Sequence, residues 1–146
     1  EVALAGGLLF AASDAELGQP EMKLGVFAPA ASCLLPYRVS HGTALDLLLS
    51  GRSLRAADAK ASGLVDAVAE DPEAAALAYF DAHLAGKSGS SLALALAAVR
   101  APMIDAVRHR FAEVEALYLA NLMQTHDANE GLAAFLERRK PQWEHR

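Results

Sequence analysis

The apolar runs of this chain change in length near residue 70, and that change limits the folds that the chain can adopt. Before this point the runs are short and end at Gly, Asp, Ser or Pro, as in LLFAA (8–12), AEL (15–17) and GLVDAVAE (63–70). Such runs are typical of strands that alternate with helices. After this point every local signal is helical. The sequence therefore predicts an α/β fold, with a β/α core over residues 1–70 and a helical region over residues 71–146.

Two short helices are expected within the first part. The segment GTALDLLLSG (42–51) carries an apolar run of helical length between two glycines. The segment AADAKASGL (56–64) places Asp58 in the first turn and Gly63 where a helix commonly stops.

Capping residues mark the helices of the second part. Asp71 is the expected N-cap of a helix that has Pro72 at its first position and closes near Gly86. Serines precede the apolar segment that ends at Arg100, and Pro102 is expected to start a separate helix. That helix has an apolar stripe that should face the core or a neighbouring subunit, formed by Met103, Val107, Phe111, Val114, Tyr118 and Leu122.

The last helix is expected in DANEGLAAFLERRK (127–140). Asp127 and Glu130 have the spacing of a capping box, with Asp in place of the usual Ser or Thr. This helix should end before Pro141.

Composition excludes several classes of function. A chain of 146 residues with 53% hydrophobic residues can bury a core, and a net charge of −5 provides no broad basic field for nucleic acid or anionic lipid. No run reaches the ~18 apolar residues of a membrane span, so no membrane segment is expected. The single cysteine, Cys33, forms no disulfide within the chain and suits the cytoplasm. No initiator methionine precedes Glu1, which indicates a piece of a longer protein.

The usual motifs of metal, nucleophilic and phosphate sites are absent. Ser32 lies outside any G-x-S-x-G context, and the AGG sequence at 5–7 lacks the later glycines and the lysine of a phosphate loop. None of the histidines has a metal-ligand spacing with another or with Cys33, so no metal is expected; they are His41, His83, His109, His126 and His145.

Two carboxylates remain as candidate catalytic groups. Glu21 follows Pro20 directly in AELGQPEMKLG (15–25), and Glu1 lies 20 positions earlier at the head of another apolar run. The residues alone leave two interpretations open. Glu21 either begins a helix as a solvated residue, or belongs with Glu1 to a site.

Three separated motifs make the chain resemble the enoyl-CoA hydratase/isomerase, or crotonase, family. They are EVALA at 1–5 followed by ELGQPEMKLG at 16–25, then LLLSGRSLRAADAKASGLVDAV at 47–68, and finally THDANEGLAAFLERRKPQW at 125–143. The resemblance covers essentially the whole chain. It implies a crotonase-like β/α core that lacks its first strands here, followed by a C-terminal helical region for CoA binding and oligomerisation.

The resemblance also implies a chemistry. In the family, two backbone N–H groups stabilise the oxygen of a CoA thioester as it becomes an enolate. The residues that match Glu1 and Glu21 hold a water between them and handle the protons of hydration. Pro20, Gly25, Pro29 and Ala30 match positions that line the substrate pocket.

Two CoA contacts are implied at the C-terminus. Phe135 and Arg138 match positions that contact the adenine and phosphates, although they could instead be a core residue and a solvated charge. Arg138, Arg139 and Lys140 form the densest basic cluster.

The chain departs from the family at two positions and leaves its subgroup open. Ala30 replaces a glycine that commonly lines the pocket, and Gly7 replaces an aspartate. The variant KLGVFAPAASCLLP (23–36) looks most like the hydratases of cyclic dienoyl-CoA thioesters, with straight-chain enoyl-CoA hydratases next.

The implied partners are an acyl-CoA thioester and further copies of the chain, as a trimer or hexamer, without nucleic acid, membrane or separate cofactor. The alternatives are an isomerase, a hydrolase, or a binding and assembly module that lacks an oxyanion donor.

Overall fold

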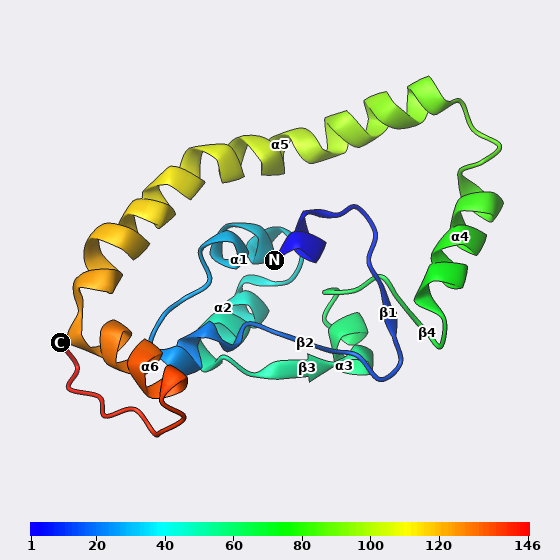
Figure 1. Ribbon diagram of the computed structural model, residues 1–146. Helices are drawn as coiled ribbons and strands as arrows, with labels where there is room; N and C mark the ends of the chain where they lie inside the picture. Colours follow the sequence, from blue (N-terminus) through cyan, green and yellow to red (C-terminus); the bar gives the residue numbers. More distant parts are fainter.

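The computed structural model describes all residues, 1–146, and contains short strands joined and covered by helices (Figure 1). The strands are β1 (Phe10–Ala12), β2 (Glu16–Gly18), β3 (Ser53–Arg55) and β4 (Ala67–Ala69). The α-helices are α1 (Pro29–Leu34), α2 (His41–Ser50), α3 (Ala56–Ala61), α4 (Pro72–His83), α5 (Gly89–Ala116) and α6 (His126–Leu136). Short 3-10 helices are η1 (Val2–Ala5), η2 (Pro20–Leu24), η3 (Leu35–Tyr37) and η5 (Leu122–Gln124), and η4 (Leu117–Asn121) is π-helical.

The four strands form two pairs, all before residue 70. β1 runs parallel to β4, with Phe10 opposite Ala67, and β2 runs antiparallel to β3, with Leu17 opposite Leu54. The expected mixture of strands and helices in this part is confirmed. β3 was not predicted, because three residues with one apolar side chain are too few to show the alternation of apolar and polar residues that indicates a strand.

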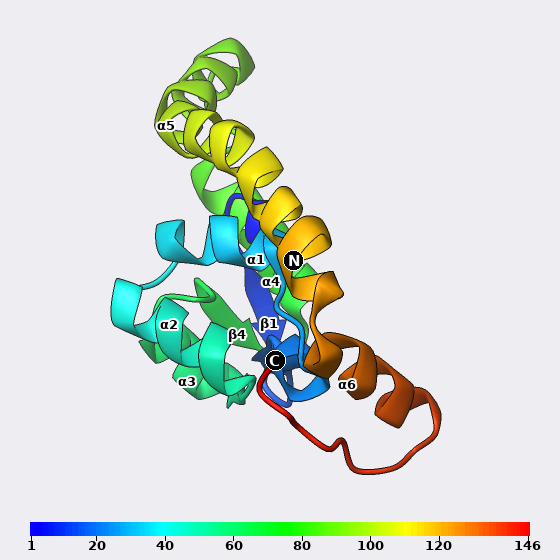
Figure 2. The same cartoon turned by 90° about the vertical axis from the view of Figure 1, so that its left-hand side faces the viewer.

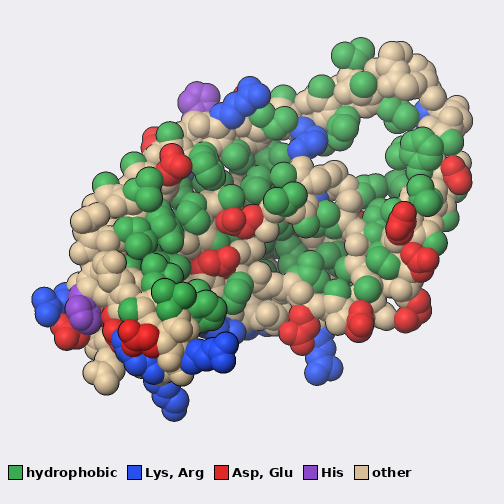
Figure 3. All heavy atoms as spheres, viewed as in Figure 1, with side chains coloured by type: hydrophobic (Ala, Val, Ile, Leu, Met, Phe, Trp, Pro, Cys, Tyr) green, Lys and Arg blue, Asp and Glu red, His purple; other side chains and the backbone are tan.

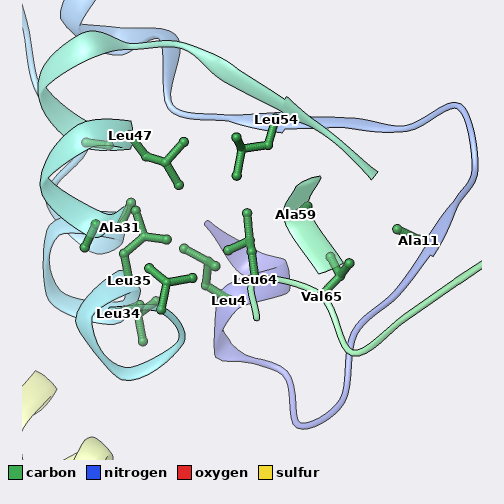
Figure 4. Packing of buried hydrophobic residues seen from close by; sticks show 13 residues of the cluster. Leu4, Ala11, Ala31, Leu34, Leu35, Leu47, Leu54, Ala59, Leu64 and Val65 are labelled. Carbon is green, nitrogen blue, oxygen red and sulfur yellow. The ribbon is translucent and has the colours of Figure 1, made fainter. Parts of the chain in front are cut away.

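A core of small and branched apolar residues lies between α1, α2, α3 and η1 (Figure 4). Leu35 and Leu47 are each only 1% exposed and pack with Leu4 and Leu64. Leu4 comes from the segment that Glu1 begins, so this packing fixes the start of the chain against α1 and α2.

The helix ends agree with the sequence only in part, because α4 ends at His83 before the predicted Gly86, and α6 begins at a cap residue other than the predicted one. Asp71 accepts a hydrogen bond from Ala74 N at 2.9 Å, so the predicted cap of α4 is confirmed. The predicted cap of α6 is wrong, because Thr125 accepts the hydrogen bond from Ala128 N at 3.2 Å. Asp127 instead binds the C-terminal tail.

α5 is one continuous helix, so the predicted new start at Pro102 is wrong. Pro102 lies inside the helix, which begins after the cap residue Ser88 and extends across α1 towards α6 (Figures 1 and 2). A proline inside a helix costs about 3 kcal/mol, which packing against α1 can offset. Met103 and Val107 of the predicted stripe pack against the core, and Tyr118 meets Phe27 edge-to-face at 5.3 Å.

The first half of α5 is apolar and largely unpartnered within this chain. Residues 89–124 contain a window of mean hydropathy 1.4, and none of that window is buried. This segment is long enough and apolar enough to cross a membrane, judged by length and composition alone. The expectation that the chain contains no such segment is therefore contradicted. A helix that packs on a protein surface meets the same criterion, so the finding is weak evidence for a span.

Candidate active site

Glu1 is fixed against the beginning of α1. Its carboxylate oxygen Oε1 accepts a hydrogen bond from the backbone N–H of Ala31 at 2.9 Å. This N–H belongs to the first turn of α1, where no backbone carbonyl is available to accept it, and a negative charge is favourable at a helix N-terminus. Pro29 and Ala30 directly precede this contact, so the structure brings Glu1 together with two of the predicted substrate-binding residues.

A cavity of about 240 Å³ opens beside Glu1. Its polar lining comes from Glu1, Glu16 and Gln19, and its apolar lining includes Leu4, Leu35 and Leu47. Such a volume lies below the ~300–1,000 Å³ of ordinary ligand pockets, so it suits a small group rather than a whole thioester. Glu1 therefore lies at a partly apolar cavity with a second carboxylate in its lining.

Glu21 lies on η2, which starts with Pro20 and ends at Gly25. Gly25 has a φ of 72°, in the left-handed region that favours glycine. The Glu21 side chain is half-buried, and its oxygen Oε2 is buried without a hydrogen-bond partner. A buried acceptor without a partner costs about 1–3 kcal/mol, so this oxygen is available to accept a hydrogen bond from a water or a ligand. Arg100 Nε is the other buried side-chain atom without a partner.

The last helix packs directly on η2. A Cβ atom added to Gly131 of α6 would lie 2.1 Å from the carbonyl oxygen of Leu24, so only glycine allows this approach. The ring of Trp143, from the C-terminal tail, covers both Gly25 and Gly131. The C-terminal region thus supports the helix that carries Glu21.

The predicted CoA contacts lie at the far end of α6. Phe135 is 62% exposed, and Arg138 is exposed with a φ of 55°, so neither is a core residue. Arg138 forms no side-chain hydrogen bond, whereas Arg139 is paired with Glu130 and Glu137. The basic cluster predicted at 138–140 therefore has fewer free cations than the sequence indicated.

Electrostatics at the tail stabilise this arrangement. The hydrogen bond from the Arg139 side chain, followed by that from Gln142 N, lowers the pKa of Glu130 to about 2. The backbone N–H of Glu144 is the largest cause that lowers the pKa of Asp127, with His126 and His145 adding to it. Burial raises the pKa of the Cys33 thiol, as expected for an unreactive buried cysteine.

The structure forms two groups from the predicted site residues. Glu1, Pro29 and Ala30 meet at the start of α1, and Pro20, Glu21 and Gly25 share η2. No hydrogen bond joins the two glutamates. The cavity beside Glu1 is also lined by Gly18 and Gln19, which directly precede η2, whereas Pro20, Glu21 and Gly25 do not line it.

Sequence reasoning missed three residues that shape this region. Glu16 lines the cavity, Trp143 covers η2, and Arg38 binds the turn after η1. Of these three, only Arg38 could have been noticed in the sequence, because it is a charged residue inside the apolar stretch LLPYRV (34–39).

Known proteins match the whole chain. The family described as enoyl-CoA hydratase/isomerase matches residues 1–146. A cyclohexa-1,5-dienecarbonyl-CoA hydratase of Thauera aromatica is 58% identical over 146 residues, which are all of this chain and 57% of that protein. A probable enoyl-CoA hydratase, echA8, of Mycobacterium leprae is 38% identical over 151 aligned residues, again covering all of this chain and 57% of the relative.

Solved structures match the fold. A carnitinyl-CoA hydratase from Mycobacterium avium superposes with a TM-score of 0.88 at 29% identity, covering 99% of this chain and 57% of that one. The predicted crotonase-like α/β fold is therefore confirmed. This chain spans 57% of the length of the curated relatives named above. The matches over its whole length show that the chain belongs to the enoyl-CoA hydratase/isomerase family.

Proposed function

We propose that the protein is a hydratase that adds water across a C=C bond conjugated to a CoA thioester. The observation that carries this proposal is the 58% identity with a cyclohexa-1,5-dienecarbonyl-CoA hydratase, over all of this chain. The identity to the probable enoyl-CoA hydratase of Mycobacterium leprae is lower, at 38%. The proposed substrate is accordingly a cyclic dienoyl-CoA, with a straight-chain enoyl-CoA as the second candidate.

Glu1 and Glu21 are the proposed proton-handling groups. The water oxygen attacks the β-carbon, one carboxylate takes a proton from that water, and the electron pair moves through the former double bond to the thioester oxygen. Collapse of the enolate then takes a proton at the α-carbon from the other carboxyl group. Backbone N–H groups that stabilise the enolate oxygen complete the proposed mechanism.

Two features of the chain support these roles. The contact with Ala31 N fixes Glu1 in one orientation and leaves its second oxygen free. The unpaired Oε2 of Glu21 is half of a carboxyl group that can accept a proton from a water or donate one. Paired carboxyl groups are suited to opposite roles as acid and base.

The substrate assignment is tested by comparing two thioesters. We expect purified full-length protein to hydrate a cyclic dienoyl-CoA with a higher kcat/KM than a short straight-chain enoyl-CoA, with product identified by mass spectrometry. A preference for the straight-chain substrate would favour the second candidate. Isomerisation or thioester cleavage without water addition would contradict the hydratase proposal.

Phe135 and Arg138 are the proposed contacts of the CoA adenine and phosphates. Both are exposed at the end of α6, and the Arg138 guanidinium has no partner within the chain. Charge reversal in Arg138→Glu should weaken thioester binding, and the difference from wild type should shrink as salt rises. Isothermal titration at two ionic strengths measures this. The matched charge reversal Lys60→Glu, on α3, should leave the affinity for the thioester unchanged. Equal thioester affinity of Arg138→Glu and Lys60→Glu would refute the contact between Arg138 and CoA.

Assembly into a trimer or hexamer is part of the proposal. α4 and α5 expose Phe80, Leu94, Leu96 and Val99, of which Phe80, Leu96 and Val99 face the hollow between the two helices. Figure 3 shows this apolar surface and the hollow beneath the first half of α5, which includes a cavity of about 510 Å³ lined mostly by α4 and α5. Exposed apolar surface of this kind favours a protein partner.

A further inference from the structure

We propose that Arg38 is a positioning residue that holds Glu1 in its catalytic orientation. The inference rests on the proposed function, because it assigns a role within the same site. Arg38 lies just after η3, on the far side of the turn that follows Glu1 and η1.

The Arg38 side chain binds this turn through two backbone carbonyls. Its Nη2 donates to the carbonyl oxygen of Gly6 at 2.7 Å and to that of Gly7 at 2.6 Å. Its Nη1 lies 3.5 Å from Asp66 Oδ2, and the side chain is only 13% exposed. The planar guanidinium makes these contacts from two nitrogens in a fixed geometry, whereas the ammonium of a lysine would have to make them all from one nitrogen.

Two further side chains complete the same clamp. Arg100 Nη2 donates to the carbonyl oxygen of Ala5 at 2.5 Å, and Asp66 Oδ2 accepts a hydrogen bond from Leu9 N at 2.7 Å. Three successive carbonyls, of residues 5–7, are thus bound by arginines. Since this turn pairs with no strand, side chains rather than a sheet hold it in place.

The clamp controls Glu1 because only one short helix separates them. η1 contains four residues, and a hydrogen bond from Leu4 N to the carbonyl oxygen of Glu1, at 3.0 Å, ties Glu1 to this helix. The Glu1 side chain itself has a single hydrogen bond, from Ala31 N. A tilt of η1 would therefore displace the carboxylate, and a misplacement of about 1 Å can cost roughly 100-fold in rate.

The test combines substitutions of Arg38 and Glu1 in the full-length protein. We expect Arg38→Met to lower kcat for hydration roughly 10- to 100-fold with KM changed less than about 2-fold. Arg38→Lys should recover part of the loss. In a Glu1→Gln background, Arg38→Met should have little further effect, because the group that it positions is already disabled. Arg52→Met, which breaks an arginine–aspartate pair on α2 and its following loop, is the matched control and should keep normal kcat.

A second readout separates this inference from the proposed function. The Ala31 amide proton in ¹⁵N-alanine-labelled protein should move upfield in Arg38→Met, as it does in Glu1→Gln, because both weaken the Ala31–Glu1 hydrogen bond. An unchanged Ala31 resonance together with normal kcat would overturn the positioning role. Equal rate losses from Arg38→Met with and without Glu1→Gln would show a purely structural role and also overturn it. A wild-type protein without hydratase activity, but with the Ala31 shift present, would refute the function and leave the clamp intact.

Discussion

At the scale of single residues, Gly131 allows the closest approach between α6 and the helix that carries Glu21. Its missing side chain leaves room for the Leu24 carbonyl on one side and the Trp143 ring on the other. The backbone of η2 is therefore supported by direct contact with α6, and a change at residue 131 should affect the Glu21 side of the site.

Gly131→Ala should destabilise the protein. The added Cβ would lie 2.1 Å from the Leu24 carbonyl oxygen, and backbone atoms cannot move aside as a flexible side chain can. Overpacking of this kind typically costs about 1–3 kcal/mol, so the free energy of unfolding in urea should fall by at least that amount. Gly42→Ala, in α2, is the matched control, since no atom lies within 4 Å of its added Cβ. It should be neutral or stabilising by up to about 1 kcal/mol, and equal losses in both variants would contradict the packing argument.

The sequence predicted site residues but not their contacts. Glu1 and Glu21 were identified through the resemblance to a family, since a glutamate after a proline is by itself more often a solvated residue. The contact of Glu1 with Ala31 joins positions 30 residues apart, and the Arg38 contacts join positions 31 and 32 apart. Contacts over such separations depend on the tertiary fold, which local patterns do not encode.

At the scale of elements, the C-terminal tail is bound to α6 by the two acidic residues that had been interpreted as a capping box. Asp127 accepts hydrogen bonds from the backbone N–H groups of Glu144 and His145, each at 2.8 Å. Glu130 accepts from Gln142 N at 2.8 Å and is paired with Arg139. These contacts place the Trp143 ring over Gly25 and Gly131.

Acid should release this tail before the rest of the protein unfolds. The pKa of Glu130 is about 2 in the folded chain against an ordinary 4.5, so its contribution to tail binding is fully present above about pH 4.5 and is lost as the pH falls towards 2. The lowered pKa of Asp127 acts in the same direction. Trp143 is the only tryptophan, so its fluorescence emission should shift to the red over this interval.

The control for this titration is Glu130→Gln. This variant should show red-shifted Trp143 emission already at neutral pH and a smaller change on acidification. Far-UV circular dichroism, recorded in parallel, separates release of the tail from loss of the helices. Superimposable emission profiles for the variant and the wild type would show that Glu130 does not hold the tail.

Helix ends were predicted correctly where a neighbouring cap residue sets them, and were missed where tertiary packing sets them. The Asp71 cap of α4 and the glycine that follows α2 depend on neighbouring residues, so the sequence reveals them. The continuity of α5 through Pro102 opposes local propensity and is explained by contacts with α1 and the core. Thr125 rather than Asp127 caps α6, and Asp127 in the first turn binds the tail instead.

At the scale of the whole molecule, the exposed apolar surface of α4 and α5 predicts self-association. Leu94 is 73% exposed and Val99 is 79% exposed, and both lie on the first half of α5. Whether residues 1–70 and 71–146 act as separate units for catalysis and assembly stays a prediction. A neighbouring subunit that packs on α5 would bury this surface.

Charge placed on this surface should weaken assembly. We expect Leu94→Glu and Val99→Glu in the full-length protein to lower the sedimentation-derived mass from that of a trimer or hexamer towards that of a monomer. Ala57→Glu adds the same charge at an exposed position of α3, which lies away from α4 and α5, and should leave the mass unchanged. An unchanged mass in all three variants would contradict assembly through α5.

The central claim is that Glu1 and Glu21 together carry the chemistry. Its most direct test is the steady-state hydration of a cyclic dienoyl-CoA by full-length protein carrying Glu21→Gln, Glu1→Gln or both. Each single substitution should lower kcat by about 10²–10⁴-fold with little change in thioester binding, because glutamine keeps the size of the side chain but removes the proton-transfer group. The double substitution should lower kcat by a smaller factor than the product of the two single-substitution factors. Near-normal turnover by Glu21→Gln would contradict the paired-carboxylate mechanism and leave Glu21 as a residue that merely begins a helix.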